Sequence, residues 1–153
     1  MSPKSLRYDT LYIDICERIS LMSFAKRAQV GAVLVKEENI ISMGWNGMPS
    51  GFDNNCEDID DTSGELVTKS EVLHAESNCL TKVAKSTQSS LGATMYITIS
   101  PCMDCAKLIA QSGISRVVYK SFYRDKKSLD FLREYGIMVE NYEELVKRHL
   151  NPS

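Results

Sequence analysis

The chain has 153 residues, 43% of them hydrophobic and 25% charged, which suits a single compact domain, 1–153, with a core able to fold unaided. No stretch approaches the roughly 20 apolar residues that span a bilayer, and the first residues lack the apolar run of a signal peptide, so we expect no membrane partner and a cytoplasmic location. The net charge of -2 lacks the basic excess of proteins that bind long nucleic acid, so a small phosphorylated partner is favoured over a nucleic acid polymer.

The first half of the chain predicts one helix and a β-hairpin. Residues Leu11 to Phe24 have the apolar spacing of an amphipathic helix. Two apolar runs, 30–35 and 40–45, are joined by a short polar segment and predict the hairpin. The acidic stretch 52–70 has few apolar residues and is predicted as a long loop, either functional or a solvated insertion.

The second half alternates helices with strands. Helices are expected at 74–85, 101–111, 128–135 and 143–150, and strands at 93–99, 116–120 and 137–140. Such alternation is typical of an α/β fold with parallel pairing. Together with the hairpin, it predicts a three-layer sandwich, in which a central five-stranded mixed sheet has helices on both faces.

One pattern of histidine, glutamate and cysteine carries the strongest chemical signal. His74 and Glu76 precede a predicted helix and strand, after which come Pro101, Cys102 and Cys105. This H-x-E…P-C-x-x-C arrangement is typical of zinc deaminases. The odd number of cysteines, five, without a secretory signal also favours metal ligands or buried thiols over disulfides.

The two cysteines suit the first turn of a helix. Ser100 fits the N-cap of that helix, and Pro101 fits its first position. Cys102 and Cys105 are three residues apart, so they share a helix face at the positive end of the dipole, which favours thiolate. With the imidazole of His74 they make three protein ligands, the number typical of a catalytic zinc with an open fourth position.

Glu76 is interpreted as a proton shuttle. It follows His74 by two residues, about 200° around an ideal helix, so the two side chains meet only if His74 lies at the helix mouth. While a metal-activated water attacks C4 of a cytosine, Glu76 would protonate N3 and then pass a second proton to the departing amine. The alternative is a structural zinc with Cys56 or His149 as fourth ligand, which leaves Glu76 without a role.

Beyond the zinc pattern, several segments match a known enzyme family. They are Gln29–Val35, Gly44–Gly51, His74–Asn78, Ser100–Lys107 and Ser112–Ile114. These segments resemble the deoxycytidylate (dCMP) deaminase family of the zinc-dependent cytidine deaminase superfamily, in its bacterial or phage-like branch. The resemblance implies a cytidine deaminase-like fold, catalytic zinc, and deamination of dCMP to dUMP with release of ammonia, which feeds thymidylate synthesis.

The resemblance also implies where the substrate binds. The candidate substrate-binding residues are Asn46, Ala75, Ser100, Pro101, Tyr123, Lys26, Arg27 and Arg124. Asn46 would contact the sugar, although an Asn-Gly pair also suits a plain turn. A cation must hold the phosphate, and Lys26, Arg27, Arg116 and Arg124 are alternatives. Relatives often carry Asp-Pro before the segment that starts at Gln29, where this chain has Phe24 to Ala28, so the phosphate contacts are not carried over.

Regulation and assembly are implied in the same way. The effector residues would be Gly44, Trp45, Asn46 and Gly47, with dCTP and Mg²⁺ as activator and dTTP as inhibitor. The alternative for Trp45 is that it packs in the core as an ordinary aromatic residue. Family members commonly form homo-oligomers, so a hexamer or dimer is implied.

Three other functions fit parts of the pattern. The first is another cytosine, cytidine or tRNA-adenosine deaminase, and the tRNA enzyme would need a more basic surface. The second is a guanine- or pterin-type deaminase, which the Gly-Trp-Asn-Gly loop disfavours. The third is a non-catalytic nucleotide-binding relative, in which Glu76 would have no use.

Overall fold

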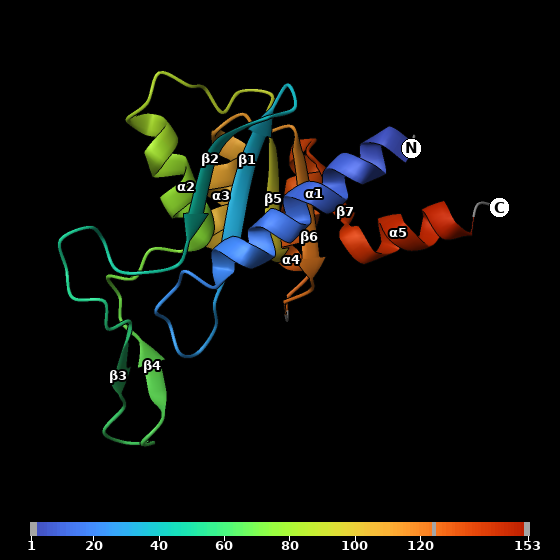
Figure 1. The fold of residues 1–153 in the computed structure, drawn as a ribbon. Coiled ribbons are helices and arrows are strands. Elements are labelled where there is room, and N and C mark those ends of the chain that lie inside the picture. The colour runs from blue at the N-terminus through green and yellow to red at the C-terminus, as the bar shows by residue number, and fades with distance from the viewer. Residues whose placement is uncertain (1–2, 124, 152–153) are drawn as a thin grey trace.

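The computed structural model describes residues 3–123 and 125–151, and Figure 1 shows their arrangement. The helices are Pro3–Ser20 (α1), Ala75–Ala84 (α2), Met103–Gln111 (α3), Lys127–Tyr135 (α4) and Tyr142–Leu150 (α5). The strands are Gly31–Lys36 (β1), Asn39–Trp45 (β2), Glu57–Ile59 (β3), Leu66–Thr68 (β4), Thr94–Ile99 (β5), Arg116–Ser121 (β6) and Met138–Asn141 (β7). None of the described helices is long and apolar enough to cross a bilayer.

Five strands form one mixed sheet in the order β2-β1-β5-β6-β7. The first hairpin pairs β1 with β2, and β1 is also antiparallel to β5. The pairs β5–β6 and β6–β7 are parallel, because helices α3 and α4 carry the chain back across one face of the sheet. The carboxyl ends of β5 and β6 therefore lie at the same edge, where α3 begins.

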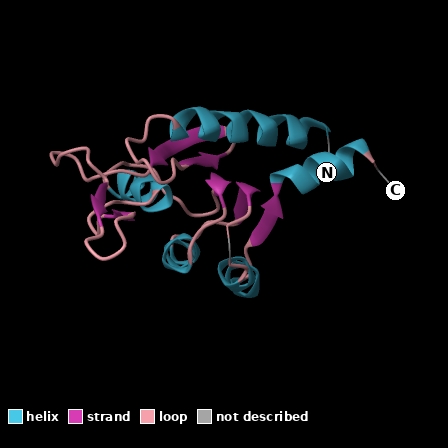
Figure 2. Ribbon diagram, turned by 90° about the horizontal axis from the view of Figure 1, so that it is seen from below, coloured by secondary structure: helices cyan, strands magenta, loops and turns pink. Residues whose placement is uncertain are grey.

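The sheet is covered on both faces. Alternate side chains of β1 divide between the two sides: Ala32 and Leu34 pack with α2, α3 and α4, whereas Val33 and Val35 pack with α1 and α5. Figure 2 shows α1 and α5 on one side of the strands and the other helices opposite. The predicted three-layer α/β sandwich with a five-stranded mixed sheet is confirmed.

A buried ion network joins α1 to the sheet. Arg116 donates to both carboxylate oxygens of Asp9 at 2.8 Å, and also to Glu140 at 2.6 Å. The hydroxyl of Tyr96 donates to Asp9 at 2.6 Å. These partners raise the pKa of the Arg116 guanidinium against the opposing effect of burial. Arg116 thus has a structural role, and it does not line the cavity described below.

Three sequence predictions about the elements were wrong. The first helix begins at Pro3 and ends at Ser20, so 21–24 lie beyond it. The acidic stretch 52–70 is not a plain loop, because β3 and β4 form a short antiparallel hairpin there. This hairpin projects away from the main sheet in Figure 1. Helix α3 begins at Met103 with Cys102 as its cap, two residues later than predicted.

Candidate active site

His74 lies at the mouth of α2, as its spacing from Glu76 requires. It is the N-cap residue, with the extended backbone angles φ −72° and ψ 157°. The residue before it, Leu73, exchanges two backbone hydrogen bonds with Gly47, at 2.8 and 3.1 Å. Because this bridge holds the chain outside the helix, the imidazole turns toward α3 while Glu76 enters the first turn of α2.

The two cysteines meet His74 from the start of α3. The sulfur of Cys102 accepts a hydrogen bond from the backbone N–H of Cys105 at 3.5 Å, so a thiol takes the capping role predicted for Ser100. Ser100 instead accepts a bond from the backbone N–H of Tyr123 at 2.7 Å. Pro101 is therefore not the first helical residue, and both thiols still lie at the positive end of the helix.

The three side chains fit a zinc ion. The Nδ1 atom of His74 lies 3.5 Å from the sulfur of Cys102 and 3.3 Å from that of Cys105. Tetrahedral zinc with ordinary bond lengths separates such nitrogen and sulfur ligands by about 3.6 Å. All three ligand atoms lie within 4.8 Å of one another, and no fourth His, Cys, Asp or Glu among the described residues joins the cluster.

Protons are shared within this cluster when no metal replaces them. Hydrogen bonds with Cys105 and then His74 lower the pKa of the Cys102 thiol to about 4. The same contact, together with burial, raises the pKa of Cys105, and the bond to Cys102 raises that of His74. A divalent cation that binds here would displace the shared protons and keep the cysteine sulfurs as thiolate ligands.

Cys56 and His149 do not complete a closed metal site. Both stand apart from the ligand cluster, and Cys56 is a buried free thiol whose sulfur lies 3.5 Å from the carbonyl of Asn54. The described residues therefore offer three ligands, and neither residue proposed as the fourth ligand of a structural zinc is near them. This donor set matches an open, catalytic zinc site.

Glu76 is buried beside the cluster, with 4% of its surface exposed. Burial raises the pKa of its carboxyl, against smaller opposite effects of its own backbone N–H and of His74. A raised pKa brings a carboxyl group closer to the range in which it can both give and take protons. The position and environment of Glu76 are thus those of a general acid and base.

The cluster opens into a cavity of about 440 Å³. Of the sequence-predicted residues, His74, Glu76, Cys102, Asn46, Ala75, Ser100, Tyr123 and Arg27 line it. Lys26, which is exposed, and Pro101, which is buried, do not line it. Arg124 lies outside the described residues, and the substrate roles of the set stay predictions.

Asn46 in this cavity already has backbone partners. Its Oδ1 accepts from the N–H of Val30 at 2.8 Å, and its Nδ2 donates to the carbonyl of Ala28 at 2.8 Å. Asn46 therefore fixes the segment that precedes β1. The second amide proton has no acceptor among the described residues, so both the structural role and the predicted sugar contact are compatible with this geometry.

The β3–β4 hairpin supplies cavity residues that sequence reasoning missed. Glu57 and Thr68 lie in its two strands and line the cavity with Val72, which follows it. The hairpin is held to the segment before β1 because the guanidinium of Arg27 donates to the hydroxyl of Thr68 at 3.0 Å. Glu57 is one of six acidic residues in 52–70, and nothing in the sequence separates it from the others.

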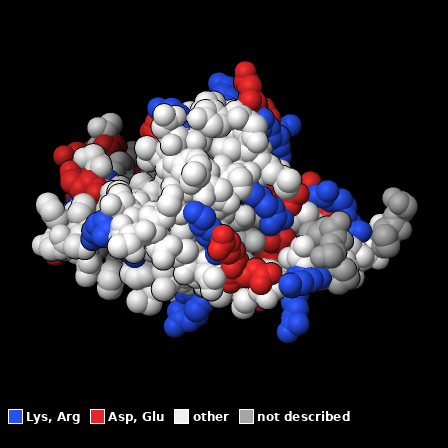
Figure 3. All heavy atoms as spheres, turned by 90° about the horizontal axis from the view of Figure 1, so that it is seen from above, with Lys and Arg blue, Asp and Glu red and all other residues white. Residues whose placement is uncertain are grey.

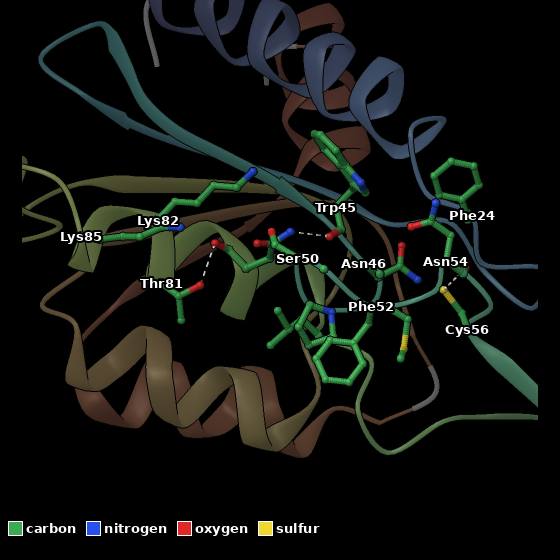
Figure 4. Close-up of a pocket in the computed structure, with 16 residues that line it drawn as sticks. Phe24, Trp45, Asn46, Ser50, Phe52, Asn54, Cys56, Thr81, Lys82 and Lys85 are labelled. Carbon is green, nitrogen blue, oxygen red and sulfur yellow. Dashed lines mark hydrogen bonds between the residues drawn. The ribbon is translucent and has the colours of Figure 1, made fainter.

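A second cavity, of about 460 Å³, lies beside the Gly-Trp-Asn-Gly loop. Figure 4 shows Lys82 and Lys85 at one end of it and Phe24, Asn54 and Cys56 at the other. Trp45, Asn46 and Gly47 line it, whereas Gly44 is buried against α2. The ammonium of Lys82 lies 4.8 Å from the centroid of the Trp45 ring.

Charges on the surface are mixed. On the face shown in Figure 3, lysine, arginine and acidic side chains lie in small groups with no continuous basic band. A net charge of -2 accords with this view.

Comparison with known proteins identifies relatives of the whole domain. The sequence profile of the cytidine and deoxycytidylate deaminase zinc-binding region matches residues 7–121. The deoxycytidylate deaminase of Enterobacteria phage T4 is 36% identical over 162 aligned residues, covering 80% of this chain and 82% of that protein. The human enzyme of that name is 40% identical over 97 residues, covering 61% of this chain and 53% of its own length. The crystal structure of dCMP deaminase from cyanophage S-TIM5, in complex with dCMP and dUMP, matches with a TM-score of 0.80, at 42% identity over 92% of this chain and 98% of that one.

Proposed function

Because the chain belongs to the cytidine and deoxycytidylate deaminase family, we propose that it hydrolyses dCMP to dUMP and ammonia. The observation that supports this most is the meeting of His74, Cys102 and Cys105 beside the buried Glu76 at one end of a nucleotide-sized cavity. Two relatives that share much of the chain's length carry the name deoxycytidylate or dCMP deaminase. We take 1–153 as the deaminase domain and the cytoplasm, where free nucleotides are found, as its location.

Glu76 moves the protons in this proposal. His74, Cys102 and Cys105 would hold the zinc, which would lower the pKa of a water toward neutrality and so supply the nucleophile. The carboxylate of Glu76 takes a proton from the attacking water and delivers it to N3 as the new C–O bond forms at C4. Glu76 then carries the remaining hydroxyl proton to the amine, the C4–N bond breaks, and ammonia leaves. The buried position of Glu76 keeps bulk water from intercepting these protons.

The rest of the cavity suits the sugar and the phosphate. Asn46 has one amide proton left to donate to the sugar. Arg27, which is exposed, also lines the cavity. An arginine can bind phosphate through two parallel hydrogen bonds. Tyr123 is 43% exposed and lines the cavity, and its backbone N–H donates to Ser100, so we expect its ring to cover the bound base.

The substrate assignment is tested by following loss of cytosine absorbance with dCMP, deoxycytidine and CMP in parallel, using zinc-loaded protein. We expect dCMP to be turned over with the highest kcat/KM. Faster turnover of deoxycytidine or cytidine nucleotides would assign the chain to another branch of the superfamily. No reaction with any cytosine substrate at full zinc occupancy would contradict the proposal and favour a non-catalytic nucleotide-binding role.

Regulation by nucleoside triphosphates is a second part of the proposal, assigned to the cavity in Figure 4. Trp45 offers a ring for a base, and Lys82 and Lys85 offer positive charge for a triphosphate carrying Mg²⁺. Gly44 does not line this cavity, and it packs instead against the backbone of α2. We expect dCTP with Mg²⁺ to activate and dTTP to inhibit, and Lys85→Ala to raise the dCTP concentration needed for half-maximal activation. A rate of dCMP deamination that stays unchanged when saturating dCTP with Mg²⁺ or saturating dTTP is added separately would contradict this assignment.

A homo-oligomer, a hexamer or a dimer, is the expected state of the regulated enzyme. Sedimentation equilibrium with and without dCTP measures it directly. A monomer under both conditions would contradict this part of the proposal.

A further inference from the structure

A buried glutamate on the β3–β4 hairpin has half of its carboxylate unused. Glu57 is 4% exposed and lines the catalytic cavity. Its Oε1 accepts hydrogen bonds from the backbone N–H groups of Lys26, at 2.7 Å, and Arg27, at 3.4 Å. Its Oε2 is buried without a hydrogen-bond partner among the described residues.

A buried carboxylate oxygen without a hydrogen-bond donor, such as Oε2 of Glu57, is unusual in a folded protein. Nearly all buried polar groups in folded proteins are hydrogen-bonded, and a buried acceptor without a donor is destabilising. Neither arginine guanidinium nor lysine ammonium forms an ion pair with Glu57 in the described residues. A donor from what fills the cavity would satisfy this oxygen.

The chemistry of the substrate restricts that donor. An ionised carboxylate only accepts hydrogen bonds. A cytosine deoxynucleotide with a fully ionised phosphate has two donor groups, the exocyclic amine and the 3′-hydroxyl. The amine must lie beside Glu76 and the metal ligands, where it is released, which leaves the 3′-hydroxyl as the donor for Glu57. The phosphate is repelled by a carboxylate and is better placed at the guanidinium of Arg27.

Resting on the deoxycytidylate activity proposed above, we propose that Glu57 accepts a hydrogen bond from the 3′-hydroxyl of the substrate and so selects a free 3′ end. The bond would satisfy Oε2 while Oε1 keeps the segment before β1 in place. Asn46, on the same cavity, would hold the sugar from the neighbouring wall. A 3′-phosphate removes the donor and adds an anion beside the carboxylate, so internal nucleotides of a polymer are excluded.

The test compares three substrates that differ only at the 3′ position. These are dCMP, 2′,3′-dideoxycytidine monophosphate, and deoxycytidine 3′,5′-bisphosphate. In Glu57→Gln the amide oxygen can still accept from Lys26 and Arg27, while an NH₂ group replaces Oε2. Glu57→Ala removes both functions. Glu65→Gln is the matched control, because it makes the same chemical change at an exposed position of the same hairpin.

The wild type should prefer dCMP over the dideoxy substrate by about 10- to 100-fold in kcat/KM, the range of a hydrogen bond to a charged group. This preference should fall about tenfold in Glu57→Gln, vanish in Glu57→Ala, and stay unchanged in Glu65→Gln. The bisphosphate should be a poor substrate of the wild type and improve relative to dCMP in both Glu57 variants.

If a Glu57 variant is inactive, measurements of product binding still test the role of Glu57. Calorimetric affinities for dUMP and 2′,3′-dideoxyuridine monophosphate should show the same loss of preference. A wild type that deaminates dCMP but treats the dideoxy substrate equally, or Glu57 variants that keep the wild-type preference, would overturn the inference. Absence of dCMP turnover in the wild type would instead contradict the proposed function, and the binding preference would still decide the role of Glu57.

Discussion

Replacing Gly44 by alanine should disturb the active site, although Gly44 does not line the catalytic cavity. Gly44 lies on β2 under the first turns of α2, the helix that carries Glu76. A Cβ atom at this position would lie 2.7 Å from the carbonyl oxygen of Ala75 and 2.7 Å from the backbone nitrogen of Cys79. Ordinary contacts begin at 3.4 Å, so the helix and the strand must separate by about 0.7 Å. Both neighbours are backbone atoms, and no side-chain rotation can relieve the clash.

This displacement has two measurable consequences. Overpacking of a core costs about 1–3 kcal/mol, which lowers the Tm of a chain of this size by about 3–10 °C. Because the shift moves Glu76 relative to Cys102 and Cys105, kcat/KM for dCMP should fall by about tenfold or more. Thermal unfolding followed by circular dichroism and steady-state kinetics at equal zinc content measure the two effects.

Gly47→Ala is the matched control for stability. A Cβ atom at Gly47 would meet nothing within 4 Å, and this glycine lies just after β2, three residues beyond Gly44. The Tm of Gly47→Ala should stay within about 1 °C of the wild type, since a substitution at a partly exposed position without new clashes is nearly neutral. A Gly44→Ala protein with wild-type Tm and wild-type kcat/KM would refute the argument that close packing of α2 on β2 positions Glu76.

Two further predictions concern stability and the metal ligands. Arg116→Met should destabilise the protein by about 3–5 kcal/mol in urea unfolding, because Asp9 keeps a charge at 2% exposure without its partner. Arg133→Met, which removes an exposed ion pair, should cost about 1 kcal/mol or less, and equal effects of the two variants would contradict this reasoning. After zinc removal by a chelator, iodoacetamide should label Cys102 first, at a rate that changes little between about pH 6 and 8, because its pKa of about 4 lies below this range. Cys79, whose pKa burial raises to about 11, should stay unlabelled in the native protein; mass spectrometry of the labelled peptides would contradict both statements if Cys79 reacted before Cys102.

The zinc site was predictable because its geometry follows from local spacing. The 200° separation between His74 and Glu76 required His74 to lie outside the helix, and it is the N-cap of α2. The spacing of Cys102 and Cys105 placed both sulfurs on one helix turn whichever residue caps it. The predicted start of α3 was wrong because of a contact distant in sequence. The hydroxyl of Ser100 accepts a hydrogen bond from the N–H of Tyr123, so the sulfur of Cys102 caps the helix instead.

The hairpin and its contribution to the cavity could not be predicted in the same way. The stretch 52–70 is rich in acidic residues and lacks the alternation of a half-buried strand. Its two short strands are fixed by contacts distant in sequence, among them the bonds from the backbone of Lys26 and Arg27 to Glu57. The burial of Glu57 depends on these contacts, so its role becomes visible only in the folded chain.

The central claim is that Glu76 transfers protons at a zinc held by His74, Cys102 and Cys105. It is tested most directly by quantifying dUMP and ammonia formed from dCMP by wild-type protein and by Glu76→Gln, both with measured zinc content. We expect equal zinc in the two proteins, with equimolar dUMP and ammonia from the wild type and a rate at least about 100-fold lower in the variant. A Glu76→Gln protein that retains both its zinc and the wild-type rate would contradict the account.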